Sequence, residues 1–281
     1  MRFHRLLPFF LALASGLEPA LAADWDSLAR EALGNRRGTV VLLALDGKVL
    51  CLQRPRLAGK ARRPGSVAKL VSAAAFLEEG IGPDHAEVCR GVDCWRIHGK
   101  LGLTEAIARS CSQYFYRLGA SLNPRIYREA RAAGFGQSTG LLEGEEAGML
   151  DPHARLACGE EGWLSTPLQW AVLAGAIANG GTRYRPYLRG KPQVLGHLPW
   201  KPRTLAALRE GMKLAVDGGS AQKAAGAGKT GTVLQDSGRS DGWFVGFAPR
   251  ENPRVALCLF VEGGTGYEDA APIARRLFEN V

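Results

Sequence analysis

The chain has 281 residues, of which 46% are hydrophobic and 22% charged, and this composition excludes a disordered, collagen-like or coiled-coil protein. The length suffices for one large domain or for two lobes that share a core. The net charge of +9 is a modest excess, and no basic stretch alternates with aromatic residues, so the sequence predicts no nucleic acid partner.

The first 22 residues have the pattern of a secretory signal peptide. A basic start is followed by an apolar run at residues 6–17 and by Ala20-Leu21-Ala22, a small-x-small sequence of the kind that signal peptidase cleaves. The alternative is a membrane anchor, but Pro8 and Glu18 keep the apolar stretch well below the roughly 20 residues of a spanning helix. We therefore expect cleavage after Ala22, export, and a location in the periplasm or cell envelope.

Export would permit disulfides among the six cysteines. Cys89 and Cys94 bracket the loop-like stretch Arg-Gly-Val-Asp and would close a small ring. Such a pair can also bind a metal, but no second cysteine or histidine pair at ligand spacing accompanies it. We predict a Cys89–Cys94 disulfide and no metal site, with free thiols as the alternative. Cys51 and Cys258 lie in apolar runs and are expected to be buried.

The N-terminal part of the mature chain predicts a helix and a β-hairpin. Residues 25–33 form an amphipathic helix, and the apolar runs 39–45 and 49–52 are joined by the turn pair Asp46-Gly47. After Pro64-Gly65 a helix is expected to begin at Ser66 and to end at Glu79, before Gly80.

The middle of the chain is mostly helical, and strands return near its C-terminus. Helical stretches are predicted at residues 103–118, 166–179 and 205–216, strands at 229–233, 242–247 and 255–261, and a closing helix at 270–278. Because a two-stranded hairpin is not stable alone, we expect the strands from both ends to join in one sheet.

Ser66 and Lys69, at the start of the helix predicted from residue 66, can carry nucleophilic chemistry. They lie three residues apart and thus share one helix face, so the amine can reach the hydroxyl. Lysine can activate a serine if burial or a neighbouring cation lowers its pKa. The pattern alone is weak, because Ser220-Ala221-Gln222-Lys223 also has it. That match lies in a Gly- and Ala-rich loop, and we reject it as the nucleophile.

Two further segments offer hydroxyl groups and an amine. Lys229-Thr230-Gly231-Thr232 opens a predicted strand, where Lys229 supplies a fixed positive charge and Gly231 lets a substrate backbone approach closely. On an extended chain Thr230 and Thr232 share the face opposite to Lys229. Ser110-Cys111-Ser112 lies in the helical stretch 103–118, and a second hydroxyl there can relay a proton to a departing amine.

The order of these segments resembles the three-motif signature of penicillin-recognising serine enzymes. Ser-x-Ser follows Ser-x-x-Lys by about 44 residues, and Lys-Thr-Gly follows about 119 residues further on. The resemblance covers nearly the whole mature chain. Residues 64–70, 98–118, 159–181, 226–249 and 270–274 are similar, in this order, to segments of the transpeptidase domain of penicillin-binding proteins.

The resemblance implies an α/β (α+β) fold with a five-stranded antiparallel sheet flanked by helices, an all-helical lobe beside it, and the active site between them. One domain would span residues 23–281, with the sheet lobe at about 30–65 and 223–281 and the helical lobe at about 66–222. It implies no metal and no cofactor. The implied catalytic residues are Ser66, Lys69, Ser110 and Lys229, with substrate binding by Ser112, Thr230, Gly231 and Thr232 and an oxyanion hole from the backbone N–H groups of Ser66 and Thr232.

The implied activity is that of a D,D-transpeptidase or D,D-carboxypeptidase that acts on D-alanyl-D-alanine peptides. The implied partners are peptidoglycan stem peptides, β-lactams and other cell-wall assembly proteins. Ser112 stands where the family usually has an asparagine that binds the substrate amide, and it is shorter by about one to two bond lengths. Class D β-lactamases also lack this asparagine, so a class D-like serine β-lactamase is an alternative, as is a catalytically reduced penicillin-binding sensor or assembly protein.

Overall fold

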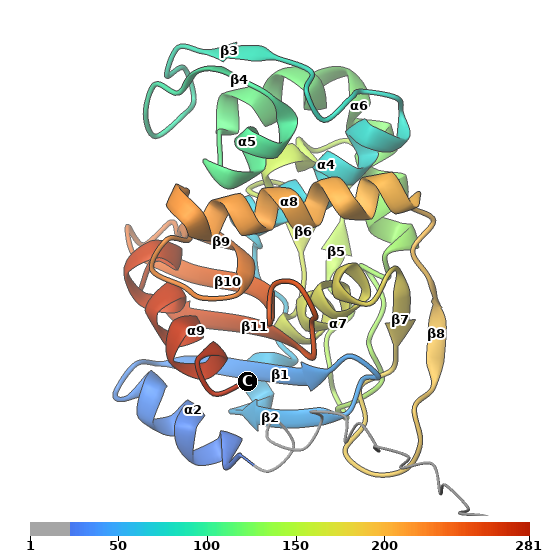
Figure 1. Cartoon of the computed structure of the whole chain (residues 1–281), viewed down its shortest axis with the longest axis vertical. Helices are drawn as coiled ribbons and strands as arrows, with labels where there is room; N and C mark the ends of the chain where they lie inside the picture. Colours follow the sequence, from blue (N-terminus) through green and yellow to red (C-terminus); the bar gives the residue numbers. More distant parts are fainter. Residues whose placement is uncertain (1–22) are drawn as a thin grey trace, which may run out of the picture.

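The computed structural model describes residues 23–281, and the predicted signal peptide at residues 1–22 lies outside this range (Figure 1). A five-stranded sheet occupies one end of the molecule, and a group of helices lies at the other. Among the described residues, no helix combines the length and the apolar character that a membrane span requires.

The five strands of the main sheet are antiparallel and come from the two ends of the described chain. Their order is β2-β1-β11-β10-β9, where β1 is Gly38–Ala44, β2 is Val49–Gln53, β9 is Ala227–Leu234, β10 is Ser240–Ala248 and β11 is Val255–Glu262. The predicted joining of the N-terminal hairpin to the C-terminal strands is confirmed, because β1 pairs with β11 along its whole length. Strand β9 forms the edge of the sheet nearest to the helices (Figure 1).

Helices cover both faces of the sheet, which explains why its strands are apolar on both sides. The helices α2 (Trp25–Leu33) and α9 (Ala271–Phe278) lie on one face, and α7 (Pro167–Ala178) lies on the other. Along β1, Val41 and Leu43 pack in the core with α7, whereas Val40 and Leu42 pack with α2 and α9. Helix α7 falls within the residues predicted for the helical lobe, yet it packs against the sheet.

The helical part is built around α4 (Lys69–Glu78), whose residues are buried as far as Leu77. Helix α4 contacts α6 (Ser112–Ala132) and α8 (Pro202–Gly218), and α5 (Leu103–Ala108) packs against α8. Because α4 is surrounded by other elements, its apolar residues lie around the whole helix rather than along one stripe. The shorter elements are α3 (Pro55–Ala58), the 3₁₀ helices η1 (Gly65–Ala68) and η2 (Leu156–Cys158), the π-helical turn η3 (Gly266–Ala270) and the strand pairs β3 and β4 (Glu87–Cys89, Gly99–Leu101), β5 and β6 (Met149–Leu150, Trp163–Leu164), and β7 and β8 (Thr182–Tyr184, Val194–His197).

The helix predicted over residues 103–118 is broken in two, which corrects the placement of Ser110-Cys111-Ser112 within a helical stretch. Helix α5 ends at Ala108 and α6 begins at Ser112. Between them Ser110 has a φ of 54°, in the left-handed region that non-glycine residues rarely adopt. Residues on both sides of the break are buried, among them Ile107 and Phe115, so the apolar pattern gives no sign of it.

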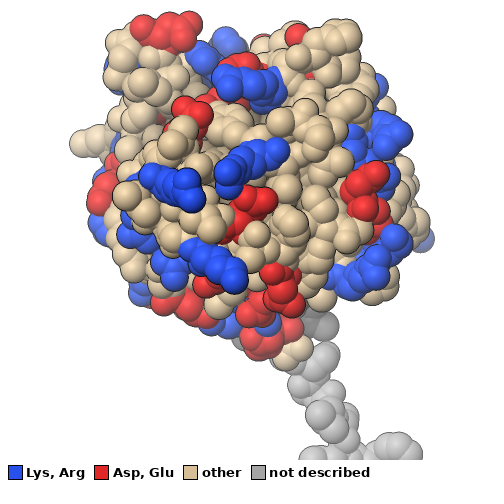
Figure 2. Space-filling view, turned by 90° about the horizontal axis from the view of Figure 1, so that it is seen from above, with Lys and Arg blue, Asp and Glu red and all other residues tan. Residues whose placement is uncertain are grey.

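The end of the molecule formed by the helices is seen from above in Figure 2. Acidic and basic side chains are interspersed over this face, so the excess of +9 is not gathered there in a patch of one sign. Exposed charge pairs of this kind contribute little to stability because water and salt screen them.

Candidate active site

Ser66 and Lys69 are brought together by the 3₁₀ helix η1, which leads directly into α4. In a 3₁₀ helix, residues i and i+3 lie above one another, and the Lys69 Nζ is 3.0 Å from the Ser66 Oγ. Gly65 precedes them with a φ of +55°, and a Cβ at this position would lie 2.6 Å from the Val233 side chain, so only glycine fits without displacement. The predicted approach of amine to hydroxyl is therefore present.

The Lys69 amine is fully buried and meets oxygens from both serines of the second segment. Its Nζ lies 2.9 Å from the Ser112 Oγ, 2.9 Å from the carbonyl oxygen of Ser110 and 3.4 Å from the Ser110 Oγ. The left-handed backbone of Ser110 turns both its carbonyl and its hydroxyl toward this nitrogen. The serine that replaces the family's asparagine is thus directly hydrogen-bonded to Lys69.

Lys229 is also fully buried and approaches the same hydroxyl from the other side. Its Nζ donates to the Ser110 Oγ over 2.8 Å and to the carbonyl oxygen of Thr230 over 2.7 Å. Burial, and then the positive charge of Lys69, lower the pKa of Lys229 well below its ordinary value. The Ser110 hydroxyl consequently links two amines, and Lys229 contacts this hydroxyl rather than lying open to a substrate.

The strand β9 passes close to the nucleophile segment at Gly231. A Cβ on Gly231 would lie 2.9 Å from the carbonyl oxygen of Pro64, so the close approach of the two segments requires glycine. The Thr232 Oγ1 accepts a hydrogen bond from the Gly266 N–H over 3.0 Å and keeps its own O–H free to donate. The Thr230 Oγ1, in contrast, donates to the Ser220 carbonyl oxygen over 2.9 Å.

A cavity of about 770 Å³ opens beside these groups, a size typical of small-molecule sites. Six of the predicted site residues line it, namely Ser66, Ser110, Ser112, Thr230, Gly231 and Thr232, while Lys69 and Lys229 lie buried behind them. The lining also includes Cys94 of the predicted disulfide and Ser220 and Gln222 of the second Ser-x-x-Lys match, and residues that no sequence motif marks: Asp93, Trp95, Arg96, Glu160, Gly218, Gly219 and Tyr267. They come from loops and helix ends whose approach depends on the tertiary fold.

The second Ser-x-x-Lys match does not form a comparable pair. Lys223 is ion-paired with Glu268, and its ammonium lies 4.6 Å from the centre of the Tyr267 ring. The Ser220 Oγ is buried and has no hydrogen-bond partner among the described residues, although Ser220 lines the same cavity. The serine of this second match therefore has no lysine to activate it.

The predicted disulfide between Cys89 and Cys94 is not formed, because every described cysteine carries a free thiol. Each of the two sulfur atoms instead lies 3.5 Å from the Nδ1 of His98, and the Cys94 sulfur lies 3.9 Å from that of Cys111. The pairing prediction considered only neighbours in the sequence, whereas the fold brings a third thiol and an imidazole to the same point. Cys51 and Cys258 are buried, as predicted.

The surroundings of this cluster lower the pKa values of two of its members, His98 and Cys94. Burial, followed by the positive charges of Arg96, Arg109 and Lys69, lowers the pKa of His98 to about 4, so the ring is neutral at pH 7. Burial disfavours the Cys94 thiolate, but backbone N–H groups, with that of Gln113 contributing most, lower the pKa of Cys94 on balance.

Comparison with known proteins identifies the family. Residues 38–279 match the penicillin binding protein transpeptidase domain, which covers most of the sequence. The chain belongs to this family. The predicted family and the predicted fold, a five-stranded antiparallel sheet with flanking helices and a helical lobe, are therefore confirmed.

Individual relatives of this penicillin-binding transpeptidase domain are moderately similar. Stage V sporulation protein D of Bacillus subtilis is 29% identical over 254 residues, which cover 72% of this chain and 38% of that protein. Peptidoglycan D,D-transpeptidase PbpA of Mycobacterium tuberculosis is 32% identical over 213 residues, covering 64% of this chain and 43% of that protein. The chain thus spans less than half the length of these curated relatives.

The fold is also similar to a solved structure, the D,D-transpeptidase domain of a peptidoglycan glycosyltransferase from Eggerthella lenta. The TM-score is 0.80 at 24% identity, and the match covers 91% of this chain and 80% of that one. This likeness extends over both the sheet and the helical part, which together position the cavity.

Proposed function

We propose that the chain is a serine acyl-transferase that acts on D-alanyl-D-alanine peptides of peptidoglycan, as a D,D-transpeptidase or D,D-carboxypeptidase, through an acyl-enzyme on Ser66. The observation that carries the proposal is the contact of 3.0 Å between the Ser66 hydroxyl and the fully buried Lys69 amine, at the wall of a substrate-sized cavity. Family membership and the names of the curated relatives support it.

In the first half of the reaction the Ser66 Oγ attacks the carbonyl carbon of the penultimate D-alanine. The Lys69 Nζ accepts the hydroxyl proton as the new C–O bond forms. The carbonyl oxygen becomes an oxyanion, which the backbone N–H groups of Ser66 and Thr232 stabilise; both residues line the cavity. A donor of this kind is worth about 3 kcal/mol in well-studied acyl transfer.

The proton on Lys69 must then reach the departing amine. The Ser110 hydroxyl lies 3.4 Å from the Lys69 Nζ and lines the cavity, so it can donate its own proton to the leaving nitrogen and take the proton from Lys69. The C–N bond breaks, and the terminal D-alanine leaves as a neutral amine. In the second half, an acceptor amine or water attacks the acyl carbon, and the same groups act in reverse.

Lys229 acts through Ser110 in this scheme. Because it is fully buried and donates to the Ser110 Oγ over 2.8 Å, it orients that hydroxyl and biases it to donate toward the cavity. Of the two threonines, Thr232 has its O–H donor available for the substrate's terminal carboxylate, whereas the donor of Thr230 is engaged by the Ser220 carbonyl. We therefore assign Thr232 the larger part in binding the carboxylate.

The place and partners of this activity depend on its substrate. The proposal includes export of the chain, a periplasmic or cell-envelope location, and binding of peptidoglycan stem peptides and β-lactams. Other cell-wall assembly proteins are the remaining proposed partners. The two alternatives are a class D-like β-lactamase and a sensor or assembly protein with reduced turnover. Both share the acylation of Ser66 with the main proposal and differ from it in the fate of the acyl-enzyme.

The test is the fate of a fluorescent penicillin on the purified protein, measured by gel fluorescence and peptide mass mapping. We expect a long-lived adduct on Ser66, release of D-alanine from a D-alanyl-D-alanine peptide, and no label on a Ser66→Ala variant. Ser220→Ala is the matched control, because it removes a serine from the same cavity that has no lysine partner. Rapid loss of label would favour the β-lactamase, and a stable adduct without peptide turnover would favour the sensor. Labelling of Ser66→Ala would refute the assignment of the nucleophile.

A further inference from the structure

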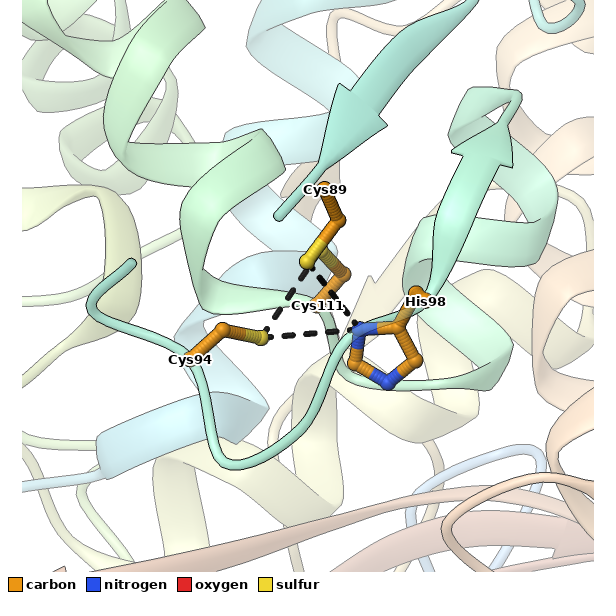
Figure 3. Close-up of side chains that lie close together, drawn as sticks. All are labelled: Cys89, Cys94, His98 and Cys111. Carbon is orange, nitrogen blue, oxygen red and sulfur yellow. Dashed lines mark hydrogen bonds between the residues drawn. The ribbon is translucent and has the colours of Figure 1, made fainter. Parts of the chain in front are cut away.

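Four side chains that the proposed reaction does not use converge beside the active site: Cys89, Cys94, His98 and Cys111 (Figure 3). Cys89 ends β3, His98 directly precedes β4, Cys94 lies in the loop between them, and Cys111 lies in the break between α5 and α6. Their three sulfur atoms and one imidazole nitrogen all lie within 4.8 Å of one another.

The separations match those of a tetrahedral zinc site. With Zn–S bonds of about 2.3 Å and a Zn–N bond of about 2.0–2.1 Å, a regular tetrahedron places two sulfur atoms about 3.8 Å apart and a sulfur and a nitrogen about 3.5 Å apart. The contacts in the structure are 3.9 Å between Cys94 and Cys111, and 3.5 Å from the His98 Nδ1 to the sulfur atoms of both Cys89 and Cys94. We propose that these four residues bind a Zn²⁺ ion as a structural Cys₃His site.

The composition of the cluster favours a metal over a disulfide. Three thiols cannot all be paired in disulfides with one another, and a disulfide between any two would leave the third thiol and the imidazole without a role. Thiolates with an imidazole at tetrahedral spacing are the ligands that select zinc among the common divalent ions. Four protein ligands fill the coordination shell, so the site has a structural rather than a hydrolytic geometry.

The charges and packing around the cluster also suit a bound ion. Zn²⁺ with three thiolates and a neutral imidazole carries a net charge of about −1, and the positive charges that act on His98 belong to Arg96, Arg109 and Lys69. The ring of Trp95 packs against that of His98, with centroids 5.4 Å apart, and holds the imidazole with Nδ1 toward the sulfur atoms. Cys89 and Cys111 are buried, which shields the ion from solvent.

The position of Cys111 connects the proposed zinc site to the active site. It stands between Ser110 and Ser112, whose hydroxyls contact Lys69 and Lys229. A metal bond at Cys111 would tie this break in the helix to the loop that contains Cys94, and that loop lines the substrate cavity. Zinc would therefore hold the Ser110 hydroxyl and one wall of the cavity in place; this last step rests on the proposed function, whereas zinc binding itself does not.

Metal content of the purified full chain, prepared without chelator, tests the binding site directly. By inductively coupled plasma mass spectrometry we expect about one zinc ion per chain, and replacement with Co²⁺ should give the thiolate charge-transfer absorption and d–d bands of a tetrahedral centre. Cys94→Ser and His98→Gln should lower zinc affinity on the order of 100-fold or more. His98→Cys should retain zinc as a Cys₄ site. Cys51→Ser is the control, because Cys51 is a buried thiol that contacts Asp26 outside the cluster, and it should retain zinc.

Several outcomes would overturn the site. A Cys89–Cys94 disulfide in the purified protein, shown by thiol alkylation and mass mapping, would do so, as would a wild-type chain with neither zinc nor cobalt absorption after metal is supplied. If Cys94→Ser fails to fold, the zinc content of the wild type and of the His98→Cys variant still tests the site. The link from zinc to the active site is tested separately by removing zinc with a chelator and measuring the rate of penicillin acylation. A drop of about tenfold or more, restored by zinc, is expected. Unchanged acylation by a zinc-binding protein would refute this link alone.

Discussion

The Ser110 hydroxyl, which links the two buried amines, offers the sharpest test of the proposed proton path. Ser110→Ala removes the acceptor that lies 2.8 Å from the Lys229 Nζ and 3.4 Å from the Lys69 Nζ. Lys69 keeps the Ser110 carbonyl and the hydroxyls of Ser66 and Ser112, whereas Lys229 keeps, among the described residues, only the Thr230 carbonyl. Most of the loss therefore falls on Lys229, and a buried donor deprived of its partner costs about 1–3 kcal/mol of folding stability.

The same change should slow acylation far more than it weakens the fold. Loss of a general acid–base group lowers rates by about 10²–10⁴, and stopped-flow fluorescence with a labelled penicillin under single-turnover conditions measures this. Ser72→Ala is the matched control: Ser72 is also fully buried and donates to the Ala157 carbonyl over 2.9 Å, but it contacts neither lysine. We expect its free energy of unfolding, measured in urea, to fall by an amount similar to that of Ser110→Ala, and its acylation rate to equal that of the wild type. Equal acylation rates for the two variants would refute the role of Ser110.

Two more substitutions probe the buried lysine and the close approach at β9. Lys229→Met should have a free energy of unfolding at pH 7 that is equal to or higher than that of the wild type, because it removes a buried cation. It should acylate more slowly, because the Ser110 hydroxyl loses the amine that orients it. Folding lowers the pKa of Lys229, so between this lowered pKa and the ordinary value of 10.5 the unfolded wild-type chain holds more protons than the folded one. Within this window the free energy of unfolding of the wild type should rise with pH relative to that of the variant. Parallel curves in urea titrations at several pH values would contradict this. Gly231→Ala places a Cβ 2.9 Å from the Pro64 carbonyl oxygen and should lower the free energy of unfolding by about 1–3 kcal/mol and slow acylation. Gly82→Ala, which has open space around it, should change the free energy of unfolding by less than about 0.5 kcal/mol. Similar unfolding free energies for the two variants would show that β9 can shift to make room for the Cβ.

The sheet and most helices could be predicted from the sequence because their signals are local. The turn Asp46-Gly47 lies between two apolar runs, and helix α7 has a capping box at Thr166 and glycines beyond Asn179, so their ends are marked by residues of known preference. The contact of Ser66 with Lys69 was predictable for the same reason, since three residues along a helix fix the spacing.

The parts that could not be predicted depend on contacts between distant segments. Nothing near Ser110 in the sequence indicates a left-handed residue, because Ile107 before it and Phe115 after it are buried and continue the apolar pattern. The four-ligand cluster escapes sequence reasoning because Cys111 lies 13 positions beyond His98, within a stretch that the pattern predicts as one helix. The spacing of Cys94 and His98, with three residues between them, is the one local sign of a metal site. The nearby Cys89 makes a Cys89–Cys94 disulfide an equally simple interpretation of the same segment.

The break between α5 and α6 connects these observations physically. A continuous helix would satisfy its backbone groups internally, and the break forgoes part of that bonding and places Ser110 in an unfavourable region of φ. In exchange, the freed carbonyl of Ser110 accepts a hydrogen bond from Lys69, and its hydroxyl accepts one from Lys229. The strained turn is therefore held by two buried amines on one side and, in our proposal, by a metal bond at Cys111 on the other. Removal of the Lys229 contact or of the metal bond should therefore loosen the same three residues, and a variant that lacks both should lose no more acylation than one in which Ser110 itself is replaced.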